Sequence, residues 1–210
     1  MSTKVKICGI TNLADAQLAV AAGADLLGFV FHEQSPRHMT LSAVAEITRQ
    51  ITPAVLRVGV FVNAPEDFVW RAIHTCGLNL LQFHGDEPPE YCRQFGLMSL
   101  KAFRMRDEAA LLELAGYQNF ADAFLLDAHS SGALGGTGQR FNWDLAVKAG
   151  QSGKPIFLAG GLTPENVAAA VVKVRPFAVD VSSGVEQAPG MKDAAKVRNF
   201  IANVRQTSPL

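Results

Sequence analysis

The chain has 210 residues, of which 49% are hydrophobic and 18% charged, and its 19 Lys and Arg balance 19 Asp and Glu. These values are typical of an ordinary soluble globular protein and exclude a disordered or fibrous chain. The zero net charge argues against nucleic acid as a partner, because proteins that bind nucleic acid replace phosphate counterions with Lys and Arg. We therefore expect small molecules as ligands.

The three cysteines, Cys8, Cys76 and Cys92, form neither a CxxC pair nor a Cys/His cluster. We expect no disulfide framework, no bound metal ion and a reducing, cytoplasmic setting. No apolar run reaches the roughly 18 residues that a membrane span requires, and the first residues lack the apolar stretch of a signal peptide. These features argue against a membrane partner.

Short apolar runs alternate with longer helical patterns along the whole chain, which predicts βαβ units and a parallel sheet. The predicted strands are residues 4–8, 25–31, 55–62, 79–83, 98–103, 122–127, 155–159 and 177–181. Eight units of about 26 residues favour a closed (β/α)8 (TIM) barrel, with residues 1–210 as a single catalytic domain. The counting alone leaves an open flavodoxin-like or Rossmann sheet as the alternative.

Two of the predicted helices have clear start signals. Asn12 or Thr11 is expected to cap an Ala-rich helix over residues 13–22, which Gly23 then ends. The sequence Thr-Pro-Glu at 163–165 supplies a cap, a proline for the first helical position and an acidic first turn, so a helix is expected to begin there.

Barrels of this kind build their active sites at the carboxyl ends of the strands. Cys8 ends the first strand. The period of two in a strand places it on the same face as Lys6, whereas Val5 and Ile7 lie on the face that suits packing against helices. We expect Cys8 to point into the barrel mouth; the alternative is a small buried apolar side chain.

Three other polar residues end or follow strands. Asp127 ends an apolar run, where an acid is costly unless it is paired, hydrated or functional, and we expect a functional role. Asp180, in the eighth strand, either pairs with Lys6 inside the barrel or acts directly. His84, after the fourth strand, is open to the same two interpretations.

Two loops have the composition of a phosphate site, LAGGL at 158–162 and VSSGV at 181–185. Glycines allow close backbone approach, and barrels often bind phosphate in the loops after strands seven and eight. The expected phosphate ligands are Gly160, Gly161, Ser182, Ser183 and Gly184. The glycine-rich segment 130–138 is expected at the same mouth. Arg37, after the second strand, is either a solvated surface side chain or a fork that binds a carboxylate.

A series of short motifs follows in a characteristic order. They are VKICGITN at 5–12, GFVF at 28–31, SPR at 35–37, VGVF at 58–61, LQFHG at 81–85, LD at 126–127, GGTG at 135–138 and VDVSSGVE at 179–186. Together they resemble the phosphoribosylanthranilate isomerase family over essentially the whole chain. The first and last motifs are specific, whereas glycine pairs occur in many phosphate-binding barrels.

The resemblance implies an Amadori rearrangement of N-(5-phosphoribosyl)anthranilate to 1-(2-carboxyphenylamino)-1-deoxyribulose 5-phosphate in tryptophan biosynthesis, with no cofactor. It implies that Asp127 protonates the ribose ring oxygen, which opens the ring to an iminium ion. Cys8 is then the implied base, which removes a proton from the adjacent sugar carbon. The implied partner is a phosphosugar, and the chain is expected to be a monomer or homodimer. The other implied substrate-binding residues are Arg37, His84, Gly136, Gly138 and Asp180.

Both implied roles need a particular protonation state. A cysteine acts as a base only as thiolate, although its unperturbed pKa is about 8.5, so a positive charge near Cys8 is required. Lys6 and the substrate iminium are the candidates. Asp127 must be protonated when substrate binds, which requires apolar surroundings or a nearby negative charge, such as the substrate phosphate or carboxylate.

Two alternatives share the phosphate loops. Indole-glycerol-phosphate synthase and ribulose-phosphate epimerase are other phosphosugar barrels, but the first is expected to use lysine with glutamate, and the second a metal with acidic partners. A barrel that has lost catalysis and only binds a phosphate ligand belongs to a different class. The intact pair of Cys8 and Asp127 favours the isomerase over both.

Overall fold

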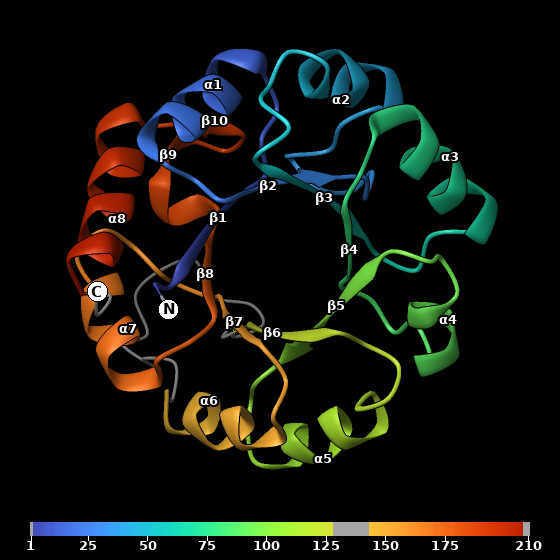
Figure 1. The fold of residues 1–210 in the computed structure, drawn as a ribbon, viewed down its shortest axis with the longest axis vertical. Coiled ribbons are helices and arrows are strands. Elements are labelled where there is room, and N and C mark those ends of the chain that lie inside the picture. The colour runs from blue at the N-terminus through green and yellow to red at the C-terminus, as the bar shows by residue number, and fades with distance from the viewer. Residues whose placement is uncertain (1, 128–142, 208–210) are drawn as a thin grey trace.

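The structure is a computed structural model that describes residues 2–127 and 143–207. Eight parallel strands form a closed barrel in which each strand pairs with the next and β8 pairs with β1 (Figure 1). The strands are β1 (Lys4–Cys8), β2 (Leu26–Val30), β3 (Leu56–Phe61), β4 (Leu80–Phe83), β5 (Met98–Arg104), β6 (Ala123–Asp127), β7 (Ile156–Leu158) and β8 (Ala178–Val181). Every strand end lies within one residue of its predicted position. The predicted (β/α)8 barrel is confirmed, and the open sheet is excluded.

Helices follow the strands and form a ring around the barrel (Figure 1). They are α1 (Leu13–Ala22), α2 (Leu41–Thr48), α3 (Glu66–Cys76), α4 (Pro89–Arg93), α5 (Ala109–Gly116), α6 (Trp143–Ala149), α7 (Val167–Val174) and α8 (Ala194–Thr207), with short 3-10 turns η1 (Gly150–Ser152) and η2 (Ser183–Val185). Within the described ranges, no helix is both long enough and apolar enough to cross a bilayer.

The predicted boundaries of α1 are confirmed. The Asn12 side chain accepts a hydrogen bond from the Asp15 backbone N–H at 2.8 Å, and Gly23 ends the helix with a φ of 98°. Thr11, the alternative cap, instead donates its hydroxyl to the carbonyl of Gly190. Asn12 is therefore the cap, and Thr11 connects the start of α1 to a distant loop.

The predicted helix start at 163–165 is wrong, because α7 begins only at Val167. The Asn166 side-chain oxygen accepts from the Thr163 backbone N–H at 2.8 Å, and its amide nitrogen donates to the Gly161 carbonyl at 2.9 Å. These bonds stabilise an irregular turn over residues 163–166 that leads into α7, and the Thr163 carbonyl accepts from the Val167 backbone N–H at 3.1 Å.

Strand alternation divides the core into an inner and an outer part. The inner cluster fills the barrel and consists of Leu26, Val58, Leu80, Leu100, Ala102, Ala123, Leu125, Phe157, Ala159 and Ala178. Val5 and Ile7 belong to the outer cluster between strands and helices, as predicted. Lys6 is fully buried, and its Nζ lies 2.9 Å from Asp180 Oδ1. The predicted pairing of Lys6 with Asp180 is confirmed.

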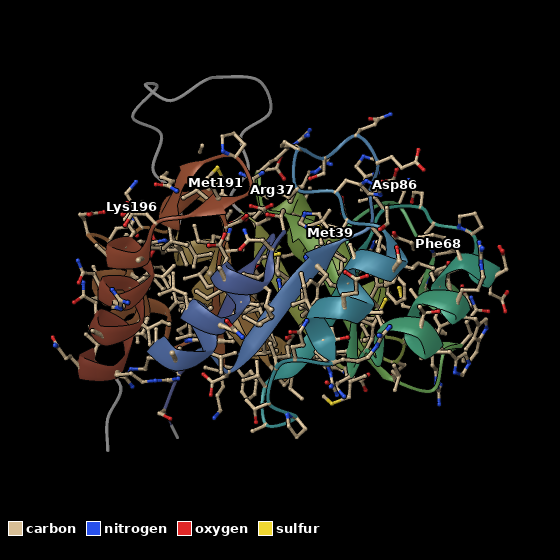
Figure 2. All side chains as sticks on the ribbon, turned by 90° about the horizontal axis from the view of Figure 1, so that it is seen from above. Arg37, Met39, Phe68, Asp86, Met191 and Lys196 are labelled. Carbon is tan, nitrogen blue, oxygen red and sulfur yellow. The ribbon has the colours of Figure 1, made fainter. Side chains whose placement is uncertain are left out.

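A hairpin of β9 (Glu186–Ala188) and β10 (Met191–Lys192) comes between η2 and α8. It lies beside the start of α1, because the Lys192 backbone N–H donates to the Asp15 carboxylate at 2.9 Å. Figure 2 shows Arg37, Asp86 and Met191 toward the same end of the barrel. The loops after β2 and β4 and the β9–β10 hairpin therefore gather at one mouth.

Candidate active site

A pocket of about 370 Å³ opens at the carboxyl ends of the strands. It is lined by ten of the residues predicted from the sequence, Cys8, Arg37, His84, Asp127, Gly160, Gly161, Asp180, Ser182, Ser183 and Gly184. Gly136 and Gly138 lie outside the described residues. The pocket also includes His32, Ser35 and Gln82, which the sequence analysis did not single out. The structure thus brings residues in or after every strand except β5 into one site.

Cys8 reaches the pocket from the end of β1 and is 8% exposed. Burial raises the pKa of its thiol, Lys6 opposes this increase, and Asp180 adds to it. Burial also disfavours the charged form of Lys6, but Asp180 and Cys8 outweigh that effect and raise the pKa of Lys6. The free site therefore holds Cys8 mainly as a thiol at neutral pH, beside a cation that favours the thiolate.

Gly28, in the neighbouring strand β2, makes room for this arrangement. A Cβ at this position would lie 2.7 Å from the Cys8 sulfur and 3.1 Å from Lys6 Nζ. The Cys8 sulfur and the Lys6 ammonium therefore lie against the same backbone position, where any side chain would displace them.

His84 connects Asp127 to a buried amide. Its Nε2 lies 3.4 Å from Asp127 Oδ2, and its Nδ1 lies 3.0 Å from the side-chain nitrogen of Gln82. With the Gln82 amide as donor, Nδ1 accepts, so the ring proton is on Nε2 and faces Asp127. Gln82 is 1% exposed and reaches His84 from inside the barrel.

The two loops expected to bind phosphate lie next to each other because β7 pairs with β8. A Cβ on Gly184 would lie only 1.9 Å from the Leu162 carbonyl oxygen, a separation that no side chain tolerates. Glycine at 184 therefore permits the close approach of the loop after β8 to the loop after β7. Gly160, Gly161, Ser182 and Ser183 line the same side of the pocket.

Arg37 lines the pocket but is not a solvated surface side chain. Its Nε donates to Glu186 Oε1 at 2.8 Å and its Nη2 to Glu186 Oε2 at 2.6 Å. Its pKa is raised, chiefly by the hydrogen bonds to Glu186. The predicted carboxylate fork is therefore real in geometry, although within this structure the carboxylate is supplied by the protein.

Sequence analysis gave no role to Glu186 or to Lys192. The Lys192 Nζ donates to the Cys8 carbonyl at 2.6 Å, to the Ser182 carbonyl at 3.3 Å and to Glu186 Oε1 at 2.8 Å. Glu186 ends the last recognised motif, which is a signal for it, but Lys192 lies in no motif. Its importance depends on contacts with residues distant in sequence.

Comparison with known proteins decides the family. A family model described as N-(5′-phosphoribosyl)anthranilate (PRA) isomerase matches residues 5–203. The N-(5′-phosphoribosyl)anthranilate isomerase of Citrifermentans bemidjiense is 56% identical over 97% of this chain and 98% of its own length. The chain belongs to the PRA isomerase family. The resemblance seen in the motifs is confirmed, and with it the expectation of an isomerase of tryptophan biosynthesis.

Solved structures of PRA isomerases have the same fold. The enzyme from Thermotoga maritima has a TM-score of 0.91 and 41% identity, covering 97% of this chain and 99% of that one. A family member in complex with reduced 1-(o-carboxyphenylamino)-1-deoxyribulose 5-phosphate has a TM-score of 0.88 and 39% identity, with the same coverage.

Removal of the cation beside Cys8 tests the electrostatics of this PRA isomerase site. Lys6→Gln should raise the pKa of Cys8 further, because the thiolate loses a favourable charge while Asp180 remains. Titration of thiolate absorbance in the free protein, with Cys8→Ser as the blank, measures this pKa. A pKa equal to or below that of the wild type would contradict the analysis.

The other cysteines and a second lysine provide the controls for that titration. Burial raises the pKa of Cys76 to about 11 and that of Cys92 to about 12. Lys4, on the same strand, is half-exposed and paired with Asp25, so Lys4→Gln should leave the Cys8 titration unchanged.

Adding one methyl group at Gly184 tests the contact between the two loops. Gly184→Ala should raise KM about tenfold or more, which corresponds to roughly 1.4 kcal/mol, because the loops must separate. Inorganic phosphate should also compete more weakly with substrate. Gly116→Ala is the matched control, since a Cβ there meets nothing within 4 Å. Equal KM values in both variants would show that the phosphate does not bind here.

Proposed function

We propose that the chain converts N-(5′-phosphoribosyl)anthranilate into 1-(2-carboxyphenylamino)-1-deoxyribulose 5-phosphate by general acid–base catalysis, with Asp127 as the acid and Cys8 as the base. One observation carries the proposal. The two side chains line one pocket from β6 and β1, and between these strands lie β7 and β8, whose loops form the candidate phosphate site. Because β1 and β6 are not adjacent strands, Cys8 and Asp127 reach the pocket from separate parts of the barrel.

The reaction proceeds in two proton transfers. Asp127 gives its proton to the ribose ring oxygen, the bond from C1 to that oxygen breaks, and the nitrogen lone pair forms a C1–N iminium. The Cys8 thiolate then removes the proton from C2, and the C–H electron pair becomes the double bond of an enolamine. Tautomerisation gives the ketone at C2. General acid and base steps each contribute on the order of 10²–10⁴ in rate.

A phosphate bound between the β6 side and the β1 side of the pocket explains how one substrate meets both Asp127 and Cys8. An anion bound by the loops after β7 and β8 fixes one end of the sugar, so the ring oxygen and C2 can face opposite walls. The Asp127 carboxylate that remains after ring opening is stabilised by the N–H that His84 turns toward it.

The buried Cys8 thiol also requires help from the substrate. Its raised pKa means that the free protein contains little thiolate at neutral pH. Lys6 is a permanent cation beside it, and the iminium formed by ring opening adds a second positive charge close to the proton that is to be removed. The fraction of Cys8 present as thiolate therefore increases when the first step is complete.

The remaining assignments concern substrate binding. Arg37 binds the anthranilate carboxylate, and His84, Asp180, Gly136 and Gly138 contact the rest of the substrate. The phosphate ligands are Gly160, Gly161, Ser182, Ser183 and Gly184. Residues 1–210 form one catalytic domain, which acts in the cytoplasm as a monomer or homodimer. Eight of these residues line the same pocket as Cys8 and Asp127, which supports the set.

The activity itself is tested by adding N-(5′-phosphoribosyl)anthranilate and following the loss of its anthranilate fluorescence. We expect turnover without added metal or cofactor. A chain that only binds phosphate ligands would leave the fluorescence unchanged, and this outcome would refute the proposal.

Isotope effects distinguish the acid from the base. In Asp127→Asn, ring opening should limit the rate, so substrate deuterated at ribose C2 should react as fast as ordinary substrate. In Cys8→Ser, removal of the C2 proton should limit the rate, and deuteration should slow turnover severalfold. Both variants should lose on the order of 10²-fold or more in kcat with little change in KM. The same isotope effect in both variants would contradict the assignment.

Arg37→Ala should mainly raise KM, because loss of a charge-assisted contact of about 1.5–3 kcal/mol weakens substrate and transition state together. The loss should be confined to ligands that carry the carboxylate. If a substrate analogue without the carboxylate loses as much affinity as the normal ligand, Arg37 does not bind that group.

A further inference from the structure

Three charged side chains meet at the wall of the pocket, and we name Arg37, Glu186 and Lys192 the clamp trio. Glu186 accepts from Arg37 through both carboxylate oxygens, at 2.8 and 2.6 Å. The same Oε1 accepts from Lys192 Nζ at 2.8 Å. The Glu186 and Lys192 side chains are 5% and 0% exposed, whereas Arg37 is 20% exposed and lines the pocket.

From this arrangement we infer that Glu186 and Lys192 are positioning residues for the recognition of an aryl carboxylate. Glu186 fixes the orientation of the Arg37 guanidinium, and Lys192 preserves its attraction for an anion. The inference deepens the proposed function and rests on the role given there to Arg37.

The Arg37 donors that bind Glu186 determine which edge of the guanidinium faces a ligand. A guanidinium has five N–H groups in one plane. Glu186 occupies the Nε–H and one N–H of Nη2. The second N–H of Nη2 and both on Nη1 are not used by Glu186, and together they form another edge suited to two parallel bonds with a carboxylate. One carboxylate on the protein side therefore leaves a complete fork for a second one.

Charge balance explains the presence of Lys192. A single glutamate paired with Arg37 would cancel its charge and weaken its attraction for a bound carboxylate. Burial raises the pKa of Glu186, but hydrogen bonds from Arg37 and Lys192 outweigh this effect and keep the pKa below its ordinary value. With Glu186 ionised between two cations, the trio carries one net positive charge, so an anion is still attracted.

Lys192 also sets where the fork lies relative to the reacting atoms. Its Nζ donates to the carbonyl of Cys8, at the end of β1, and to the carbonyl of Ser182, at the end of β8. The carboxylate fork, the base and the phosphate loop are therefore joined through one buried ammonium group. A ligand that carries both a phosphate and an aryl carboxylate at a fixed separation fits this frame, and one that lacks the carboxylate leaves a fork of Arg37 unused.

Two matched ligands separate orientation of Arg37 from general support of the fold. The probes are reduced 1-(o-carboxyphenylamino)-1-deoxyribulose 5-phosphate and its phenylamino counterpart without the carboxyl group. In calorimetry, Glu186→Gln should weaken binding of the carboxylated ligand about tenfold or more. Its effect on the affinity for the other ligand should be less than about twofold. Glu46→Gln, an exposed glutamate of α2, should change neither.

A double-mutant cycle then shows whether Glu186 acts through Arg37. In an Arg37→Ala background, Glu186→Gln should cause no further loss of affinity for the carboxylated ligand. The inference is overturned if Glu186→Gln weakens binding of both ligands equally or of neither. It is also overturned if the loss of affinity persists in the Arg37→Ala background. Failure of the proposed function has a different signature, because Arg37→Ala itself would then fail to discriminate between the ligands.

Glu186→Asp keeps the test valid if the glutamine variant does not fold. This variant keeps the negative charge that pairs with Lys192. Because the aspartate side chain is one methylene shorter, its carboxylate cannot hold both donors of Arg37 in the same geometry. We expect the same selective loss for the carboxylated ligand. Wild-type affinity of Glu186→Asp for both ligands would contradict the inference.

Discussion

Pairing of β1 with β8 closes the barrel, and the composition of the site depends on this closure. Lys6 stands opposite Asp180 in the register, and their ion pair of 2.9 Å crosses the seam between the two strands. Closure places Cys8, from the first strand, beside the loop that follows the last strand. The proposed base and the proposed phosphate loop, more than 170 residues apart in sequence, thus share one pocket.

Several buried lysines near the mouth are paired with carboxylates. Lys192 is matched with Glu186, and Lys101 with Glu87 at 2.8 Å. An uncompensated charge in such a place costs several kcal/mol, roughly 3–5 when one partner is removed. The same low-polarity surroundings disfavour the Cys8 thiolate. In the proposed mechanism, the site therefore combines a weakly ionised thiol with a fixed cation and a substrate that becomes positive during the reaction.

Much of the fold could be predicted because it is encoded locally. Short apolar runs between helical patterns placed the strands, and the strand ends then pointed to Cys8 and Asp127. The start of α7 at Val167 could not be predicted, because the start signal at 163–165 marks an irregular turn before the helix, which the side chain of Asn166 stabilises. Lys192 was missed for a different reason. Its contact with the Cys8 carbonyl spans 184 positions, and no pattern in the surrounding sequence reports such a pairing.

A crystal structure of the protein with the reduced product analogue is the most direct test of how the pocket works. We predict the phosphate between residues 160–161 and 182–184, and the carboxylate on the free edge of Arg37 with Glu186 still bound to the other edge. The sulfur of Cys8 should lie near C2, with Asp127 near the oxygen derived from the ribose ring, on the opposite side of the sugar. A ligand that places Cys8 and Asp127 on the same side, or its carboxylate away from Arg37, would contradict the mechanism.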